Sequence, residues 1–252
     1  RDPYRNMAVD EVLLIAVERS AAPNTVRFWR NPNAVVIGRS QSLEAEVNLE
    51  ACEKLGTPVV RRFTGGGTVY QDHGNLNWTI VARRNHALSR AGGVLGIFEE
   101  FSSPILEGIK ILRTQAEFRP PNGIFIGEKK ISGMAAYVKK GSILCHGTLL
   151  VSTNLGVLTS VLKLLKTEVT TLQQESGARI SMASAKKAIA AGFGMVYGQV
   201  RRGKLSGEEI ELIRLCEKKY AAKEWNLRGE LREQNSDRVP RRPSPRVSLR
   251  GE

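Results

Sequence analysis

A glycine-rich segment that follows two arginines is the part of the sequence best suited to binding an anion. Residues 61–70 read RRFTGGGTVY, which places three consecutive glycines between two β-rich runs. Glycine lets the backbone approach a ligand closely and direct N–H groups into a concavity, and arginine suits phosphate or carboxylate groups. The segment is not a Walker loop, because no Gly-Lys-Ser/Thr follows at the required spacing. A flexible loop beside two solvated arginines explains the same residues equally well.

A pair of lysines near the middle of the chain is the second candidate. Residues 127–134 read GEKKISGM, and a strand over 130–138 places four alternating residues on one face: Lys130, Ser132, Met134 and Ala136. Lys129 then belongs to the turn. A lysine on the inner face of a sheet usually serves an anionic ligand, because an unpaired buried ammonium is very costly. The alternative is a turn lysine whose ammonium reaches water.

The histidines and cysteines do not form a metal site or a nucleophilic pair. His73, His86 and His146 are not at metal-ligand spacing, so no metal site made of protein ligands is expected. His146 follows Cys145 on an expected strand, where neighbours point to opposite faces, so the two cannot share a proton and Cys145 is expected in the core. Three widely spaced cysteines without a CxxC pair argue against disulfides and favour a reducing cytoplasm.

The elements that position these residues form a pattern of clustered strands and later helices. Helices are expected over 6–20, 48–55, 93–113, 155–165, 182–192 and 206–221, with Asn6 as the first N-cap and Ser206/Glu209 at capping-box spacing. Strands are expected over 25–30, 34–38, 58–63, 75–82, 123–127, 130–138 and 142–152. The first two, joined by NPN, read as a hairpin. The pattern predicts an α+β fold with a mixed, largely antiparallel sheet.

Length and charge restrict the class of protein further. The chain has 252 residues, 41% of them hydrophobic, which is enough for one large domain and excludes global disorder. No apolar run is long enough to span a membrane, and the first residues do not resemble a signal peptide. A net charge of +13 suits an acidic partner. Residues 238–250 hold five arginines and no acid, so 227–252 is expected to be a disordered basic tail.

Several segments together resemble the lipoate–protein ligase family. Residues 61–79, RRFTGGGTVYQDHGNLNWT, resemble the signature RRxSGGGxVxHDxGNxN. GEKKISGMA and LCHGTLLV are similar to the family's GxRKxSGSA and HHGTLLL, and KKYAAKEWN to its aromatic-x-x-x-EWN end. DPYRNMAVDE and VRFWRNPNAVVIGRSQSLEAEVN extend the resemblance, which runs in order from residue 2 to about 226. It implies a catalytic domain over 1–226 with the fold shared by biotin and lipoate ligases.

The resemblance implies a two-step reaction in which lipoate and MgATP give lipoyl-adenylate, and a lysine of an acceptor protein then takes the lipoyl group. Lys130 would be catalytic, bridging the lipoate carboxylate and the α-phosphate, and Arg62 would contact the nucleotide. The residues expected to line or support the ligand site are Gly65, Gly66, Gly67, Thr68, Val69, Tyr70, Asp72, Asn75, Asn122, Ser132, Gly133, His146, Gly147 and Thr148. No covalent enzyme intermediate is expected.

The chain departs from the family pattern at three places. Gln71 stands where the family usually has His, and an amide cannot carry a proton. Asn122-Gly123 replaces an Asn-Asp pair, which removes a carboxylate that would help to hold metal or adenine. The segment before Val169 is short and reads KTE, so the nucleotide contacts of that loop are not carried over.

Three other functions fit the sequence less well. An octanoyl- or lipoyl-transferase that uses an acyl-cysteine needs a Cys after the HG strand, and residues 147–215 contain none. A biotin ligase would show a GRGRxxR-type loop. A basic nucleic-acid-binding module would be expected to interleave exposed aromatics, which make up only 6% of the chain.

The expected partners are an acceptor protein and an accessory ligase subunit. The acceptor is a lipoyl domain, the glycine-cleavage carrier or a sulfur-metabolism carrier, and the sequence does not choose among them. Only 26 residues follow Asn226, whereas many members of the family carry a further domain there. A separate subunit is therefore expected to assist the adenylation step. Neither a membrane nor a nucleic acid is an expected partner.

Overall fold

Two β-sheets form the centre of the computed structural model, which describes residues 2–84, 93–165 and 167–229. The larger sheet is antiparallel throughout and has the order β1 (Thr25–Trp29), β5 (Asn75–Arg83), β9 (Ser142–Leu150), β8 (Lys129–Val138), β7 (Gly123–Ile126), β6 (Glu117–Arg119). In the smaller sheet, β2 (Asn33–Ile37) pairs with β3 (Val59–Arg61) in parallel and with β4 (Val69–Asp72) in antiparallel fashion. The predicted mixed, largely antiparallel α+β fold is confirmed.

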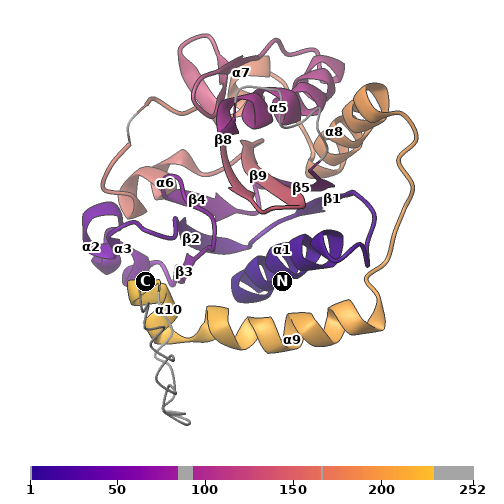
Figure 1. The fold of residues 1–252 in the computed structure, drawn as a ribbon. Helices are drawn as coiled ribbons and strands as arrows, with labels where there is room; N and C mark the ends of the chain where they lie inside the picture. The colour runs from indigo at the N-terminus through magenta and orange to yellow at the C-terminus, as the bar shows by residue number, and fades with distance from the viewer. Residues whose placement is uncertain (1, 85–92, 166, 230–252) are drawn as a thin grey trace, which may run out of the picture.

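Helices cover both faces of the larger sheet (Figure 1). Helix α1 (Pro3–Glu18) and helix α9 (Gly207–Ala221) lie together on one face, and α5 (Val94–Ile111) and α8 (Met182–Tyr197) lie on the other. The remaining described helices are short: α2 (Leu43–Glu46), α3 (Leu49–Lys54), α6 (Leu155–Val161), α7 (Leu172–Ser176) and α10 (Lys223–Arg228). Helices α2, α3 and α6 lie beside the smaller sheet. None of the helices within the described ranges is long and apolar enough to cross a membrane.

The central strands β5 and β9 have one apolar face and one face that carries their buried polar residues, with the apolar Val81 and Leu144 packed against α1 on the same side. Their odd and even positions separate because side chains alternate along a strand. The face toward α5 and α8 is made of Leu76, Trp78, Ile80, Ala82, Ile143, Cys145 and Leu149. The face toward α1 carries Asn75, Asn77, Thr79, His146 and Thr148, all of them buried. Cys145 is therefore a core residue, as predicted.

The N-termini of α9 and α1 confirm one predicted cap and contradict the other. Ser206 and Glu209 form the predicted capping box of α9, with both reciprocal hydrogen bonds present. The predicted N-cap at Asn6 is wrong, because α1 begins earlier: Asp2 accepts a hydrogen bond from the Tyr4 N–H, and Pro3 fills the first turn. Proline is favoured there since its missing N–H has no partner in a helix start anyway.

The predicted hairpin of residues 25–30 and 34–38 is also wrong. Strand β1 pairs with β5 in the larger sheet, whereas β2 pairs with β3 and β4 in the smaller one. The turn at residues 30–32 therefore carries the chain from one sheet to the other. Strands β4 and β6 and helices α2, α7 and α10 were not expected, and all are short.

The predicted domain boundary at residue 226 falls inside the last described helix. Helix α10 continues to Arg228, and Gly229 ends it in the left-handed conformation. Residues 230–252, which contain most of the expected tail, lie outside the described residues, as does His86. The two-part division of the chain stays a prediction.

Candidate functional site

A cavity of about 460 Å³ is lined by residues of both sheets. Twelve of the predicted site residues line it: Arg62, Gly67, Thr68, Val69, Tyr70, Asn122, Lys130, Ser132, Gly133, His146, Gly147 and Thr148. The structure thus brings the glycine-rich segment, the lysine segment and the HG strand to one place. Gly65, Gly66, Asp72 and Asn75 are not among the lining residues, and their contacts are with the protein around it.

The glycine segment forms a loop whose backbone carbonyls accept hydrogen bonds from Arg62. This guanidinium donates to the carbonyl oxygens of Gly65 (2.6 Å) and Gly67 (2.7 Å) and to Thr64 Oγ1 (3.0 Å). Burial lowers the pKa of Arg62 to about 10, so it stays charged at neutral pH. With its carbonyls turned toward Arg62, the loop keeps a fixed shape at the cavity wall.

Two glycines permit this loop geometry. Gly66 has a φ of 87°, a left-handed conformation that other residues rarely adopt. A Cβ on Gly38 would lie 2.1 Å from the Gly66 carbonyl oxygen, so only glycine allows the loop to approach the end of β2. Gln41 then joins the two segments, because its Oε1 accepts from Thr68 Oγ1 (2.8 Å) and from the Gly38 N–H (3.0 Å).

The neighbouring arginine, Arg61, has a structural role, because its guanidinium binds backbone carbonyls and not the cavity. It is 1% exposed and does not line the cavity. Its guanidinium donates to the carbonyls of five residues, namely Gly38, Arg39, Gln41, Asn226 and Leu227. The two arginines of the segment therefore differ, and only Arg62 faces the site.

Lys130 extends over the cavity wall without a carboxylate partner among the described residues. A Cβ on Gly133 would lie 3.6 Å from the Lys130 Nζ, and a Cβ on Gly123 would lie 3.0 Å from its Cε. The ammonium lies 5.8 Å from the centre of the Phe125 ring, and burial lowers its pKa. Lys129, in contrast, forms an ion pair with Glu168 (3.3 Å) and does not line the cavity.

The backbone of Lys130 is held by the segment that leads to α7. The Lys130 N–H donates to the Glu168 carbonyl (2.9 Å), and the Thr170 N–H donates to the Lys130 carbonyl (3.1 Å). Leu164, Leu165 and Thr167, in the same segment, also line the cavity. This segment therefore fixes the lysine in place at the cavity edge.

The predicted face of β8 needs a correction. Alternation had placed Ser132, Met134 and Ala136 with Lys130, but Ile131 is an extra residue opposite β7 and forms a β-bulge. Past the bulge, Met134 and Ala136 pack with the apolar core, whereas Gly133 lies beside the Lys130 ammonium. The prediction that Lys129 belongs to the turn is also wrong, because β8 begins at Lys129, which pairs with Ile126. The two lysines still differ, since only Lys130 lines the cavity.

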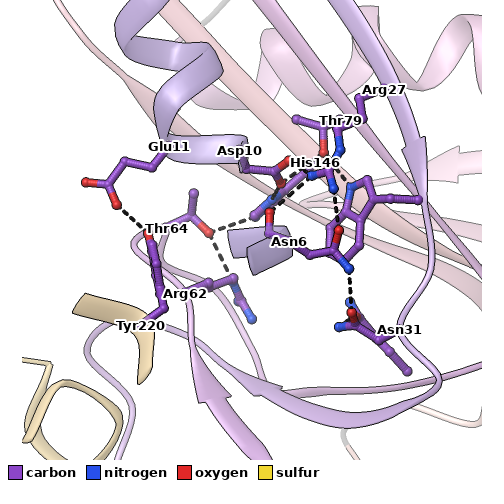
Figure 2. A network of polar contacts seen from close by, with 12 residues as sticks. Asn6, Asp10, Glu11, Arg27, Asn31, Arg62, Thr64, Thr79, His146 and Tyr220 are labelled. Carbon is purple, nitrogen blue, oxygen red and sulfur yellow. Dashed lines mark hydrogen bonds and ion pairs between the residues drawn. The ribbon is translucent and has the colours of Figure 1, made fainter. Parts of the chain in front are cut away.

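His146 lies in a chain of buried polar contacts that links α1 to the glycine loop (Figure 2). Its Nδ1 is 3.0 Å from Asp10 Oδ2, and its Nε2 is 2.8 Å from Thr64 Oγ1. Asp10 is fully buried and is paired with Arg27 (2.7 Å). Since Thr64 also accepts from Arg62, an unbroken series of contacts joins Arg27 to the glycine loop.

Gln71, at the position where the motif resemblance led us to expect a histidine, is held by side-chain amides. Its Oε1 accepts from Asn31 Nδ2 (2.8 Å), and Asn31 Oδ1 accepts from Asn6 Nδ2 (2.7 Å). Arg27 donates to Asn6 as well, so this second series joins the first (Figure 2). Glu11, which lies in α1 like Asn6, accepts a hydrogen bond from the Tyr220 hydroxyl of α9 and so joins the two helices. Gln71 is thus a positioned hydrogen-bonding group at the cavity wall.

Other predicted residues hold the surrounding turns and strands. Asp72 accepts from the N–H groups of Gly74 and Asn154 (both 2.8 Å), which lie in the turn before β5 and at the start of α6, and not from the glycine loop that it was expected to support. Asn75 Oδ1 accepts from the Leu149 N–H (3.1 Å). Asn122 Nδ2 donates to the Met134 carbonyl (2.6 Å) at the cavity edge.

Sequence reasoning missed several lining residues, including Trp29, Asn77 and Arg119. The alternation of polar and apolar residues in NLNWTIVA, which separates Asn77 from its neighbours Leu76 and Trp78, was the available signal. Arg119 and Trp29 carry no such signal, because they come from strands that only the tertiary fold brings to the cavity.

No cysteine is among the described residues that line the cavity. Cys52 and Cys145 are buried, and burial raises the pKa of both thiols. Burial and the neighbouring Glu11 raise the pKa of Cys216 to about 12. A thiolate nucleophile is therefore disfavoured at all three positions at neutral pH.

The family model for the lipoyl protein ligase A/B catalytic domain matches residues 2–194. The chain therefore belongs to the lipoyl protein ligase A/B catalytic domain family, and its fold is that of the lipoate ligases. The resemblance found in the sequence motifs is confirmed.

Relatives within this family carry two kinds of name. The chain is 35% identical to "Probable lipoate-protein ligase A" of Mycoplasma genitalium over 71% of its own length, but it spans only about half (52%) of that relative. It is 30% identical to "Lipoate-protein ligase A subunit 1" of Thermoplasma acidophilum, with 91% and 93% of the two chains covered. It is also 32% identical to "Octanoyltransferase LipM" of Symbiobacterium thermophilum, with 88% and 93% covered.

Solved structures agree with the fold. A Thermoplasma acidophilum protein with bound lipoic acid superposes with a TM-score of 0.81 at 30% identity, covering 91% of this chain and 95% of the other. A lipoate-protein ligase A bound with ATP gives 0.80 at 30% identity, covering 90% and 94%. The ligase of a bipartite lipoylation system of Thermoplasma acidophilum, studied with its E2 lipoyl domain, gives 0.80 at 29% identity, covering 92% and 94%.

Proposed function

We propose that this chain is the catalytic part of an ATP-dependent lipoate–protein ligase. The observation that carries the proposal is the Lys130 ammonium, which lies at the wall of a cavity without a carboxylate partner among the described residues and suits a bound anion. A lipoate carboxylate and the α-phosphate of ATP are two anions that must meet during adenylation. Relatives of similar length and structure that are named ligases, or that hold lipoic acid or ATP, support the same reaction.

The reaction has two steps. A carboxylate oxygen of lipoate attacks the α-phosphorus of ATP, and pyrophosphate leaves. The amine of an acceptor lysine then attacks the acyl carbon and loses a proton as the amide bond forms, while AMP leaves with the electrons of the broken acyl–oxygen bond. Lys130 offsets the negative charge that collects between the two anions, and the loop held by Arg62 positions the adenylate.

Magnesium enters this reaction as part of MgATP. The described residues contain no group of three His, Cys, Asp or Glu side chains suited to holding a metal ion. Phosphate oxygens and water are the usual ligands of a nucleotide-bound magnesium ion. We therefore assign no side chain of this chain to the metal, and we derive the chemistry from Lys130 and the glycine loop.

Two partners belong to the proposal. The acceptor is a lipoyl domain, a glycine-cleavage carrier or a sulfur-metabolism carrier with an acidic surface, because the sequence is strongly basic. The second partner is an accessory subunit that assists adenylation. The Thermoplasma relative, of which this chain covers nearly the whole length, is named subunit 1, and its lipoylation system is described as bipartite.

An acyl-cysteine transferase is the second candidate, favoured by the relative named octanoyltransferase. Such an enzyme needs a thiolate within reach of the acyl group. The cysteines lie away from the described lining of the cavity and have raised pKa values, which weighs against it.

Lipoate-dependent exchange between ATP and pyrophosphate tests the proposal, with the chain measured alone and with a candidate accessory subunit. We expect exchange with the subunit present, and lipoyl transfer from preformed lipoyl-adenylate by the chain alone, read by intact mass of the acceptor. Cys52→Ser and Cys216→Ser should retain transfer. An acyl-enzyme mass that forms without ATP and disappears in one of these variants would establish the transferase instead.

A further inference from the structure

One row of residues crosses the larger sheet along the cavity, with one residue from each of five neighbouring strands. Trp29 is the cross-strand partner of Asn77, and Asn77 is the partner of Thr148. The Gly133 N–H reaches Thr148 Oγ1 (3.4 Å), and Gly133 pairs with Gly123. All five line the cavity. Since directly paired residues share a face, the row defines a continuous track from β7 to β1.

The track has the Lys130 ammonium at one end and the polar side chain of Asn77 farther along it. The Lys130 ammonium lies at Gly133 and Gly123. Asn77 lies two strands away from Gly133, which is roughly 10 Å at the usual spacing between strands. An extended eight-carbon acid spans roughly 9 Å from its carboxyl carbon to its last carbon. An acid of this length with its carboxylate at Lys130 therefore ends beside Asn77.

The amide of Asn77 has a fixed orientation. The Leu149 N–H donates to Asn75 Oδ1, so the Asn75 Nδ2 points toward Asn77 and donates to its Oδ1 (3.3 Å). The Asn77 Nδ2 is left as a buried donor with no partner among the described residues, in a residue only 1% exposed. A buried amide donor that lines a cavity is suited to an acceptor on the ligand.

We propose that Asn77 distinguishes a lipoyl group from an octanoyl group. The inference rests on the proposed function. The two acids have the same eight-carbon chain, but lipoate carries sulfur atoms on C6 and C8, which close the dithiolane ring at the tail. The dithiolane is a cyclic disulfide, whose sulfur atoms are weak hydrogen-bond acceptors like the sulfur of a thioether, so the Asn77 N–H donates to one of them. An octanoyl tail places only CH₂ and CH₃ groups there and leaves the donor without a partner.

The test compares lipoyl-adenylate with octanoyl-adenylate as preformed donors. Their dissociation constants and their kcat/KM values for acceptor transfer are measured for wild type and Asn77→Leu, which keeps the branched shape of the side chain but has no donor. Thr153→Val is the matched control, because Thr153 Oγ1 is also a buried group with no partner among the described residues, and Thr153 does not line the cavity. Asn77→Asp is a second variant that still accepts from Asn75 but offers no N–H to the cavity.

We expect Asn77→Leu to lower the ratio of lipoyl to octanoyl affinity roughly tenfold, because removing a donor abolishes a difference of this order. Thr153→Val should leave the ratio unchanged. If Asn77→Leu does not fold, the same loss of preference is expected in Asn77→Asp. An unchanged ratio in a folded Asn77 variant overturns the inference while the function stands. A wild-type chain that binds neither adenylate overturns both.

Discussion

The two faces of strands β5 and β9 show how one pair of strands serves both stability and binding. Toward α5 and α8, Leu76, Trp78 and Ile80 pack with the apolar residues of β9. Toward α1 and the cavity, the alternating residues Asn77 and Thr79 are buried with polar neighbours. The two sets are adjacent in sequence and differ only in the face to which they point. A hydropathy average over such a strand therefore hides the site.

The apolar face should govern stability alone. Trp78 is fully buried and is not among the lining residues of the cavity. We expect Trp78→Ala to lower the free energy of unfolding by about 3–5 kcal/mol, because it leaves a large void in the core. Urea unfolding measures this change, and adenylate binding by the remaining folded protein at low temperature should change little. A Trp78→Ala variant of normal stability that has lost adenylate binding would show that the apolar face also governs binding.

The cavity side should govern chemistry. We expect Lys130→Ala to reduce lipoyl-adenylate formation about 10²–10³-fold, the usual effect of removing one preorganised charge-stabilising group. Stability should not fall, because burial lowers the pKa of Lys130 and the charged form therefore opposes folding at neutral pH. Lys129→Ala, which removes only an exposed ion pair with Glu168, is the control. Equal losses of activity in both variants would contradict the assignment.

Substitution of Asp10 tests whether the polar face of β5 and β9 also stabilises the fold. Its carboxylate contacts Arg27, Thr79 and His146, and Asp10→Asn removes the charge while keeping the shape. We expect a loss of about 1.5–3 kcal/mol in unfolding free energy, typical of hydrogen bonds to a charged group. Because His146 contacts Thr64, we also expect weaker adenylate binding. A change in stability without a change in binding would show that the network only supports the fold.

The smallest expected effect concerns pH. Burial lowers the pKa of Lys130 below the ordinary lysine value of 10.5, so its ammonium loses the proton at a lower pH than a solvated lysine does. Adenylate affinity should therefore fall as the pH rises through this alkaline range. Lys130→Arg keeps its charge and should move the fall to higher pH. Titration of affinity against pH in both proteins measures the shift, and coincident curves would assign the fall to another group.

Local patterns predicted most of the long elements correctly. Helices near 93–113 and 206–221 and the strands from 123 to 152 carry clear periodicity, and the structure places α5, α9, β7, β8 and β9 there. The predicted hairpin at NPN is wrong because the residues of a turn do not determine which strands the segments on either side pair with. The predicted cap of α1 at Asn6 is wrong because Pro3, which favours the first turn of a helix, makes the helix begin earlier.

The candidate site was predicted mainly by motifs, and its contacts required the tertiary fold. The motifs named Arg62, Lys130 and His146, and the structure brings all three to the cavity. No local pattern indicates that Arg61 is used by the fold, since its partners at residues 226 and 227 are distant in sequence. The bulge at Ile131 is likewise a property of pairing with β7.

The contacts of Arg61 have a consequence for the order in which the enzyme is made. Its guanidinium and backbone are joined to Asn226, Leu227 and the indole N–H of Trp225, which are among the last described residues. Synthesis proceeds from the N-terminus, so β3 leaves the ribosome long before these partners do. Until residues 225–227 emerge, Arg61 lacks acceptors that its burial requires. The nascent chain therefore completes the contacts of Arg61, which directly precedes Arg62 and the glycine loop, only after residues 225–227 have been made.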